Sequence, residues 1–319
     1  MFGEVVWHRS SPLKAIRAKA PNAKVEFAPG TDLAAAAKLA KASDVAIVFV
    51  NQPSSEGADI ASLSLPDNQD SLVAAIADAN PHTIVVLETG GAVTMPWIDR
   101  VSAAIEAWFP GIRGGEAIAD LLFGDVNPSG RLPITFPRSE QDLPRPKLAQ
   151  QPAPGPGDMV DYIPSLGFKI NNRKFDVSYD EGLKVGYKWY EAENKLPLFA
   201  FGFGLSYTTF SYSDLKATAA TLTFNVKNTG SRAGSETAQV YVTLPASAGE
   251  PFHRLVAWQK VALAPGESKS VTLALDPHYL SIFNADRETW DLLPGSYTIS
   301  AGGSSNNLPL HAAVEVGAH

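Results

Sequence analysis

The sequence predicts an α/β domain with a mostly parallel sheet, followed by an all-β domain of the fibronectin type III kind. In the first half, apolar runs alternate with segments of helical periodicity, as in βαβ units. In the last third, short alternating runs are separated by turn residues, as in a β-sandwich. The length of 319 residues exceeds one typical hydrophobic core and favours two domains.

The elements of the α/β domain follow one another without long interruptions. Helices are expected at 33–42, 66–80, 96–101 and 115–123, and strands at 45–50, 83–87 and 103–108. In such a sheet, the loops after the strands meet at one edge, where α/β proteins carry their functional groups.

The sandwich is predicted from five runs, at 222–227, 238–244, 254–263, 270–275 and 296–301. Before it, from about residue 137 to 197, the periodicity fails and proline and glycine accumulate. The predicted boundaries are therefore 1–137 for the α/β domain, 138–205 for an irregular linker region and 206–319 for the sandwich.

Composition narrows the classes of partner and cofactor. A net charge of -7 does not favour nucleic acid, which selects a basic surface. There is no cysteine for disulfides or thiolate metal sites, and the six histidines show no ligand spacing. Neither a membrane span nor a signal peptide is visible. We expect no metal and no cofactor, and the compartment stays open.

The loop NQPSSEGADIASLSLP, residues 51–66, carries the candidate catalytic residue Glu56 at the end of the apolar run 45–50. A loop carboxyl shielded from water can have its pKa raised toward neutrality and serve as a general acid/base. Glycoside hydrolysis uses such a group. The alternative is a solvated loop acid with no chemical role.

Other candidate sites are weaker. Ser54 and Ser55 raise a serine esterase, but no G-x-S-x-G motif is present. The glycines of GIRGGEA, residues 111–117, match no nucleotide fingerprint and favour tight helix packing. Trp97 and Trp108 can stack on a sugar, but packing in the core is their expected role, and packing is also expected for Trp258 and Trp290.

Long strings place the sequence in a family. From about residue 12 onward, the chain closely resembles the C-terminal half of family 3 glycoside hydrolases of the β-glucosidase type. The strings are SSEGADIASLSLPDNQ, ANPHTIVVLETGGAVTMPW, AWFPGIRGGEAIADLLFGDVNPSGRLPITFP, YDEGLKVGYKWYE and PLFAFGFGLSYTTF. The resemblance implies an α/β sandwich domain and then a fibronectin III-like domain. Segments 127–133 and 202–207 match signatures interpreted as joints between these domains.

The resemblance also implies site residues. The family's acid/base glutamate in its E-G-x-D motif falls on Glu56, with Gly57 and Asp59 as matching neighbours. Two positions depart from the pattern: Ile60 stands where many members have arginine, and Phe203 where many have histidine. The residues that bind the sugar are not predicted, because in this family they lie mostly in a preceding barrel domain.

We expect that barrel, with its nucleophilic aspartate, and the start of the first α/β strand to lie outside these 319 residues. We therefore expect a portion of a retaining β-glucosidase, nearly inactive alone. Its partners would be a β-glucoside or oligosaccharide and a barrel domain or chain, with self-association through the uncovered surface as a further possibility. The alternative is a non-catalytic module that binds carbohydrate or docks to a partner. Relatives are commonly periplasmic or secreted.

Overall fold

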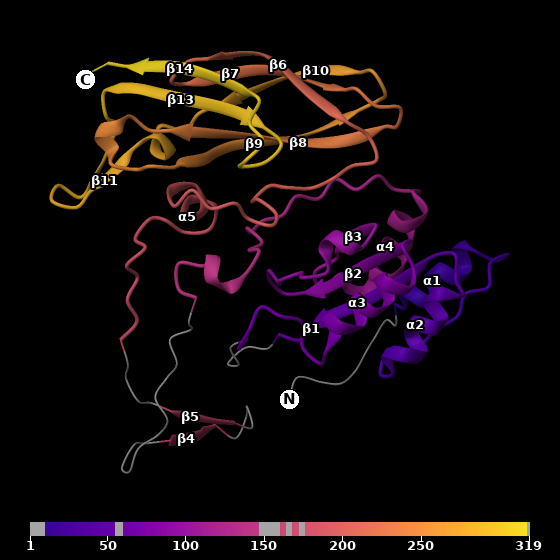
Figure 1. Cartoon of the computed structure of the whole chain (residues 1–319). Helices are drawn as coiled ribbons and strands as arrows, with labels where there is room; N and C mark the ends of the chain where they lie inside the picture. The colour runs from indigo at the N-terminus through magenta and orange to yellow at the C-terminus, as the bar shows by residue number, and fades with distance from the viewer. Residues whose placement is uncertain (1–9, 55–59, 147–159, 164–167, 172–175, 318–319) are drawn as a thin grey trace.

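The computed structural model describes residues 10–54, 60–146, 160–163, 168–171 and 176–317. Figure 1 shows an α/β unit of helices packed on a short sheet, and beside it a sandwich of longer strands. Within the described residues, no helix is long and apolar enough to cross a membrane.

The α/β unit is built on a parallel three-stranded sheet in the order β1-β2-β3. Its strands are β1 (Ala46–Gln52), β2 (Thr83–Thr89) and β3 (Ala103–Glu106). Its helices are α1 (Pro12–Lys19), α2 (Leu33–Lys41), α3 (Gln69–Ala79) and α4 (Gly114–Phe123), with single 3-10 turns η1 (Ile98–Arg100) and η2 (Gly111–Arg113). The predicted alternation is confirmed, except that α1 was not foreseen and 96–101 forms only a 3-10 turn.

Tryptophan packing in this unit follows the prediction. Trp97 is fully buried, and its indole Nε1 donates a hydrogen bond to Asp70 on α3 at 2.8 Å. Trp108 is half-buried and packs edge-on against the buried ring of Phe136, with the ring centroids 6.2 Å apart. Both rings therefore belong to the core, which the apolar faces of β1 and β2 complete.

Two of the three glycines of 111–117, Gly114 and Gly115, serve close packing as expected, whereas Gly111 has open space around it and a positive φ of 72°. A Cβ built on Gly115 would lie 2.6 Å from the backbone carbon of Ser11, directly before α1. The Ser11 side chain caps α1 by accepting from the backbone N–H of Lys14. Because only glycine leaves this space, α4 approaches the start of α1 more closely than a side chain would permit.

The segment predicted to be irregular contains regular elements. β4 (Val160–Ile163) and β5 (Phe168–Asn171) pair antiparallel, α5 (Tyr187–Ala192) follows, and η3 (Glu140–Asp142) precedes them. Phe136 and Phe199, which flank this segment in the sequence, form an antiparallel bridge. The domain boundaries given above stay a prediction.

The sandwich consists of a three-stranded sheet, β10-β7-β6, and a four-stranded sheet, β14-β13-β8-β9. Its strands are β6 (Phe210–Ala217), β7 (Thr221–Asn228), β8 (Gly234–Thr243), β9 (His253–Leu263), β10 (Ser268–Ala274), β13 (Gly295–Gly302) and β14 (Leu310–Val316). Two 3-10 turns, η4 (Ala246–Ala248) and η5 (Pro277–Leu280), and the hairpin β11 (Ile282–Asn284) with β12 (Thr289–Asp291) lie in its connections. The all-β prediction is confirmed.

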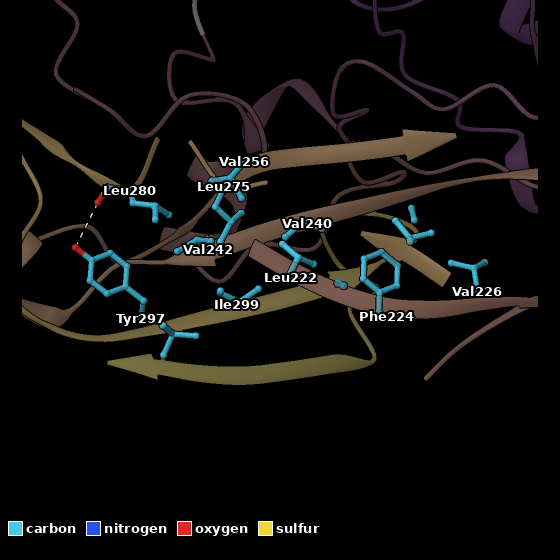
Figure 2. Close-up of a cluster of buried hydrophobic side chains, with 14 of the residues drawn as sticks. Leu222, Phe224, Val226, Val240, Val242, Val256, Leu275, Leu280, Tyr297 and Ile299 are labelled. Carbon is cyan, nitrogen blue, oxygen red and sulfur yellow. Dashed lines mark hydrogen bonds between the residues drawn. The ribbon is translucent and has the colours of Figure 1, made fainter. Parts of the chain in front are cut away.

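Side chains from both sheets fill the space between them (Figure 2). Along β7, Leu222, Phe224 and Val226 are buried and alternate with more exposed residues, as the period of a strand requires. The packing role predicted for the two sandwich tryptophans is wrong. Trp258 is 63% exposed and Trp290 49% exposed, because each lies outside the buried layer.

A buried ion pair joins the α/β unit to the sandwich. Arg131, in the joint segment 127–133, pairs with Glu236 on β8, and their side chains are only 10% and 5% exposed. The Tyr212 hydroxyl on β6 donates to the other carboxylate oxygen of Glu236 at 2.6 Å. Burial and the nearby Glu236 charge raise the pKa of Tyr212 far above its ordinary value.

The two predicted joint segments also contact each other directly. The Asn127 side-chain oxygen accepts from the backbone N–H of Tyr207 at 2.7 Å and from the Ser206 hydroxyl at 2.9 Å. The backbone N–H of Leu132 donates to the Phe203 carbonyl at 2.9 Å. These contacts agree with the interpretation of both segments as joints between domains.

Removing one member of the buried pair should destabilise the joint. In Glu236→Gln the Arg131 guanidinium stays buried without its counter-charge, and such a loss costs about 3–5 kcal/mol. We expect urea unfolding to show that loss in the free energy of unfolding. The exposed Glu315→Gln on β14 is the control, with a change within about 0.5 kcal/mol. A Glu236→Gln variant as stable as the wild type would contradict this role.

Candidate functional site

The candidate site lies at the edge of the sheet where β1 and β2 end. In the parallel register Asn51 is opposite Glu88, and Gln52 is opposite Thr89. The predicted catalytic loop leaves this edge directly after β1. Residues 55–59 lie outside the described residues, so Glu56 and its neighbours Ser55, Gly57 and Asp59 are placed only through the flanking chain.

The returning limb of this loop is tied to the domain by two side chains. The buried Gln52 amide donates to the carbonyl oxygens of Ser62 at 3.3 Å and Ser64 at 3.4 Å. The Glu140 carboxylate on η3 accepts from the Ser62 hydroxyl at 2.8 Å and from the Leu63 N–H at 2.5 Å. The chain that returns after residues 55–59 is therefore hydrogen-bonded to both β1 and η3.

The chain that leaves β1 packs against residues that follow β2 and β3. A Cβ added at Gly90 would lie 3.0 Å from the Phe109 ring and 3.4 Å from the Ser54 Cβ. Ser54, Gly90 and Phe109 thus lie close together immediately before residues 55–59. A larger residue at 90 would push Phe109 away and change the exit of the loop.

A half-buried carboxyl, Glu106, connects the turns that follow β2 and β3 next to Ser54. It accepts from the Trp108 backbone N–H at 2.9 Å and from the Thr89 hydroxyl at 3.2 Å. Trp108 has the unusual φ of 53° for a residue with a side chain, and the bond to Glu106 holds that turn. Burial raises the pKa of Glu106 to about 7, and its hydrogen bonds only partly offset this.

A second carboxyl, Glu88, faces an open groove of ≈ 430 Å³. Burial raises the pKa of Glu88 as well. Glu106 is opposite Leu87 in the register, so the side chains of Glu88 and Glu106 point to opposite faces of the sheet. The groove is lined by Asn51, Gln52, Pro53, Glu88, Phe109, Pro110 and Gly111.

This arrangement favours acid/base chemistry at the strand ends. Burial raises the pKa of Glu106 to about 7, and a carboxyl that keeps its proton near neutral pH can donate it. Sequence reasoning missed both Glu88 and Glu106, although each is an acid at the end of an apolar run. Their burial depends on turns that the sequence pattern does not reveal.

The structure gives little support for a metal site or for a serine esterase. The part of the chain that the structure describes contains no cluster of three or more histidines or carboxylates able to hold a metal ion. Ser54 is exposed and, as far as the chain is described, hydrogen-bonds to no histidine, so the esterase alternative is not strengthened. Ile60, in place of the expected arginine, is half-buried beside the catalytic segment.

Comparison with protein families identifies the chain. Residues 3–207 match the glycosyl hydrolase family 3 C-terminal domain, and residues 236–305 match the fibronectin type III-like domain. The chain belongs to glycosyl hydrolase family 3. Both matches agree with the predicted family and with its order of domains.

Relatives in family 3 are β-glucosidases. Beta-glucosidase B of Emericella nidulans is 43% identical over 301 residues, which are 89% of this chain and 34% of the relative. Thermostable beta-glucosidase B of Acetivibrio thermocellus is 39% identical over 297 residues, 88% of this chain and 36% of the relative. The chain therefore spans about a third of the length of these relatives.

Solved family 3 structures have the same fold. DesR, a beta-glucosidase of Streptomyces venezuelae solved with D-glucose, is 39% identical with a TM-score of 0.75, over 89% of this chain and 35% of DesR. The beta-D-glucoside glucohydrolase of Trichoderma reesei is 31% identical with a TM-score of 0.83, over 96% of this chain and 45% of that chain.

The raised pKa of Glu106 should make folding stability depend on pH. From pH 4.5, the ordinary value, to about pH 7 only the folded chain keeps this proton, so rising pH favours unfolding. The glutamine side chain of Glu106→Gln does not titrate, so this variant does not lose folding stability in this way as the pH rises. We expect its stability relative to the wild type to increase between pH 5 and pH 8 in urea unfolding. Glu315→Gln controls for removal of an exposed charge, and a constant difference for Glu106→Gln would contradict the assignment.

Proposed function

We propose that this chain supplies the general acid/base of a retaining β-glucosidase, with Glu56 as the proton donor. The observation that carries the proposal is the position of the loop: it leaves the end of β1, and both limbs are held at that edge by Gln52, Glu140, Gly90 and Phe109. The family's E-G-x-D motif falls on Glu56, and the β-glucosidase relatives support a glucoside as substrate.

The proposed reaction has two steps. In the first, a carboxylate attacks the anomeric carbon while the Glu56 carboxyl gives its proton to the departing glycosidic oxygen. In the second, the Glu56 carboxylate takes a proton from water, whose oxygen displaces the attacking carboxylate and releases the sugar. Retention requires the two carboxyl groups to lie about 5–5.5 Å apart.

The attacking carboxylate is proposed to come from a barrel domain or chain. A nucleophile must be ionised, whereas burial raises the pKa of Glu106 to about 7 and so favours its neutral form below that pH. Glu106 is also occupied by the turns around Thr89 and Trp108. Because the relatives are about three times as long as this chain, they have room for a further domain.

The proposed contact surface for the barrel begins beside the groove. Phe109 is 61% exposed and Ile112 is 64% exposed, and both belong to the segment that follows β3. Apolar side chains gathered next to a polar site commonly mark an interface. Self-association through the same residues is the alternative use of this surface.

A non-catalytic module that binds carbohydrate or a partner is the second candidate function, favoured by the same exposed residues. Glu56→Gln separates the two candidates. A binding module with this substitution would keep its affinity for glucose, whereas an acid/base catalyst would lose activity. The serine esterase is weaker still, and labelling of Ser54 or Ser55 by a fluorophosphonate would support it.

The catalytic proposal is tested by fusing this chain to the barrel of beta-glucosidase B from Emericella nidulans. We expect negligible hydrolysis of cellobiose by the 319-residue chain alone and measurable hydrolysis by the fusion. Glu56→Gln in the fusion should lower kcat about 10²–10⁴-fold, the usual contribution of a general acid.

Glu315→Gln, in the exposed part of β14, is the matched control and should leave kcat unchanged. Full activity of the Glu56→Gln fusion, or rapid cellobiose hydrolysis by the unfused chain, would refute the proposal.

A further inference from the structure

The β11–β12 hairpin of the sandwich exposes its aromatic face to solvent. Phe283 and Trp290 are cross-strand partners, 53% and 49% exposed, whereas Ile282 and Asp291 form the neighbouring pair and are half-buried. Because adjacent residues of a strand point to opposite faces, the rings point outward and the mixed face points inward. In a surface hairpin the large apolar side chains usually face inward. Packing in the sandwich does not explain why these two rings face outward.

Two residues of η5 extend the exposed rings into a cluster. The His278 ring lies over Trp290 with the centroids 4.0 Å apart, and Phe283 lies 5.4 Å from Trp290 on the hairpin. Tyr279 is 53% exposed and lies 6.0 Å from His278. We call these four residues the aromatic surface, and Figure 1 shows the hairpin that carries it projecting from one end of the sandwich.

The base of the aromatic surface is fixed to the sandwich core. The Arg254 guanidinium on β9 donates to the carbonyls of Tyr279 at 3.2 Å and Ser281 at 2.7 Å. The Tyr297 hydroxyl donates to the Leu280 carbonyl at 3.3 Å, the bond drawn in Figure 2. Leu280 itself is buried in the core, so the backbone under the rings is held on both sides.

The inner face of the hairpin is held by a polar network around Asp291. Its carboxylate accepts from the Asn284 amide and the Thr289 hydroxyl, each at 3.0 Å, and it pairs with Arg287. The Asn284 oxygen accepts from the Arg287 backbone N–H at 3.1 Å. The rings therefore do not need to be ordered by a ligand, which lowers the entropic cost of binding.

Charge and area restrict what the aromatic surface can bind. Its four side chains include no carboxylate, ammonium or guanidinium group, and Arg287 pairs with Asp291. The exposed carboxylates of Asp276, Asp286 and Glu288 lie nearby and disfavour an anionic ligand, so an uncharged ligand fits best. Half-exposed rings offer about 300–400 Å² in total. A stable protein partner needs about 800 Å² on each side. A small uncharged ligand with apolar faces is therefore the better match.

We propose that the aromatic surface is a non-catalytic binding site for a soluble β-glucan chain. Sugar rings combine apolar C–H faces, which pack on aromatic rings, with hydroxyls at their edges. The Trp290 plane is tilted by 59° to Phe283 and by 46° to His278, so a flat crystalline surface cannot contact all three. A single chain can follow the tilt. The choice of β-linked glucose rests on the proposed function.

The test is affinity electrophoresis of the 319-residue chain in gels that contain laminarin or barley β-glucan. We expect the glucan to retard the wild type, and Trp290→Ala to weaken binding at least about tenfold, with Phe283→Ala also weakened. Trp258→Ala is the matched control, because Trp258 is an exposed sandwich tryptophan outside the aromatic surface. It should bind like the wild type, and equal thermal unfolding of the variants would show that they fold.

No retardation of the wild type by either glucan would overturn the proposal, as would unchanged binding by Trp290→Ala and Phe283→Ala. Self-association that Trp290→Ala abolishes, without glucan binding, would also overturn it in favour of a protein contact. Hydrolysis plays no part in this measurement. Glu56→Gln should bind normally, so failure of the catalytic proposal and failure of this one are distinguishable.

Discussion

Parallel pairing of β1, β2 and β3 is the constraint on which the candidate site depends. It brings the ends of the strands to one edge, and with them Gln52, Glu88 and Glu106. The ends of parallel strands lack the short turns that join antiparallel ones, so longer loops emerge there. Here the emerging loop carries Glu56, and the neighbouring turns form its surroundings. The acid/base role proposed for this edge therefore depends on the parallel topology as well as on Glu56.

The sandwich contributes through a rigid joint to the α/β unit. The buried Arg131–Glu236 pair and the contacts of Asn127 connect the two without a flexible hinge at that point. A buried ion pair adds little net stability, but the loss of one charge leaves the other buried without a partner, which is strongly destabilising. The pair therefore favours the arrangement in which both charges are in contact.

Much of the fold was predictable because local signals agree with tertiary structure. The strands before Glu56 and at 83–87, the helix at 33–42 and the close packing at Gly115 all followed from the sequence. The aromatic hairpin did not, because the sandwich tryptophans break the rule that large apolar residues are buried. The raised pKa of Glu106 was also hidden, since it depends on burial by turns that include the positive φ of Trp108. The place of Glu56 after an apolar run made it a candidate, and the family motif favoured it over a solvated loop acid.

The most direct test of the central claim is how the loss of Glu56 depends on the leaving group. In the barrel fusion, Glu56→Gln should release dinitrophenolate from dinitrophenyl β-glucoside in a rapid burst, because this leaving group needs no proton, and turnover should then be slow. With methyl β-glucoside, whose leaving group must be protonated, the first step should itself be slowed about 10²–10⁴-fold. An equal loss with both substrates and no burst would mean that Glu56 is not the proton donor.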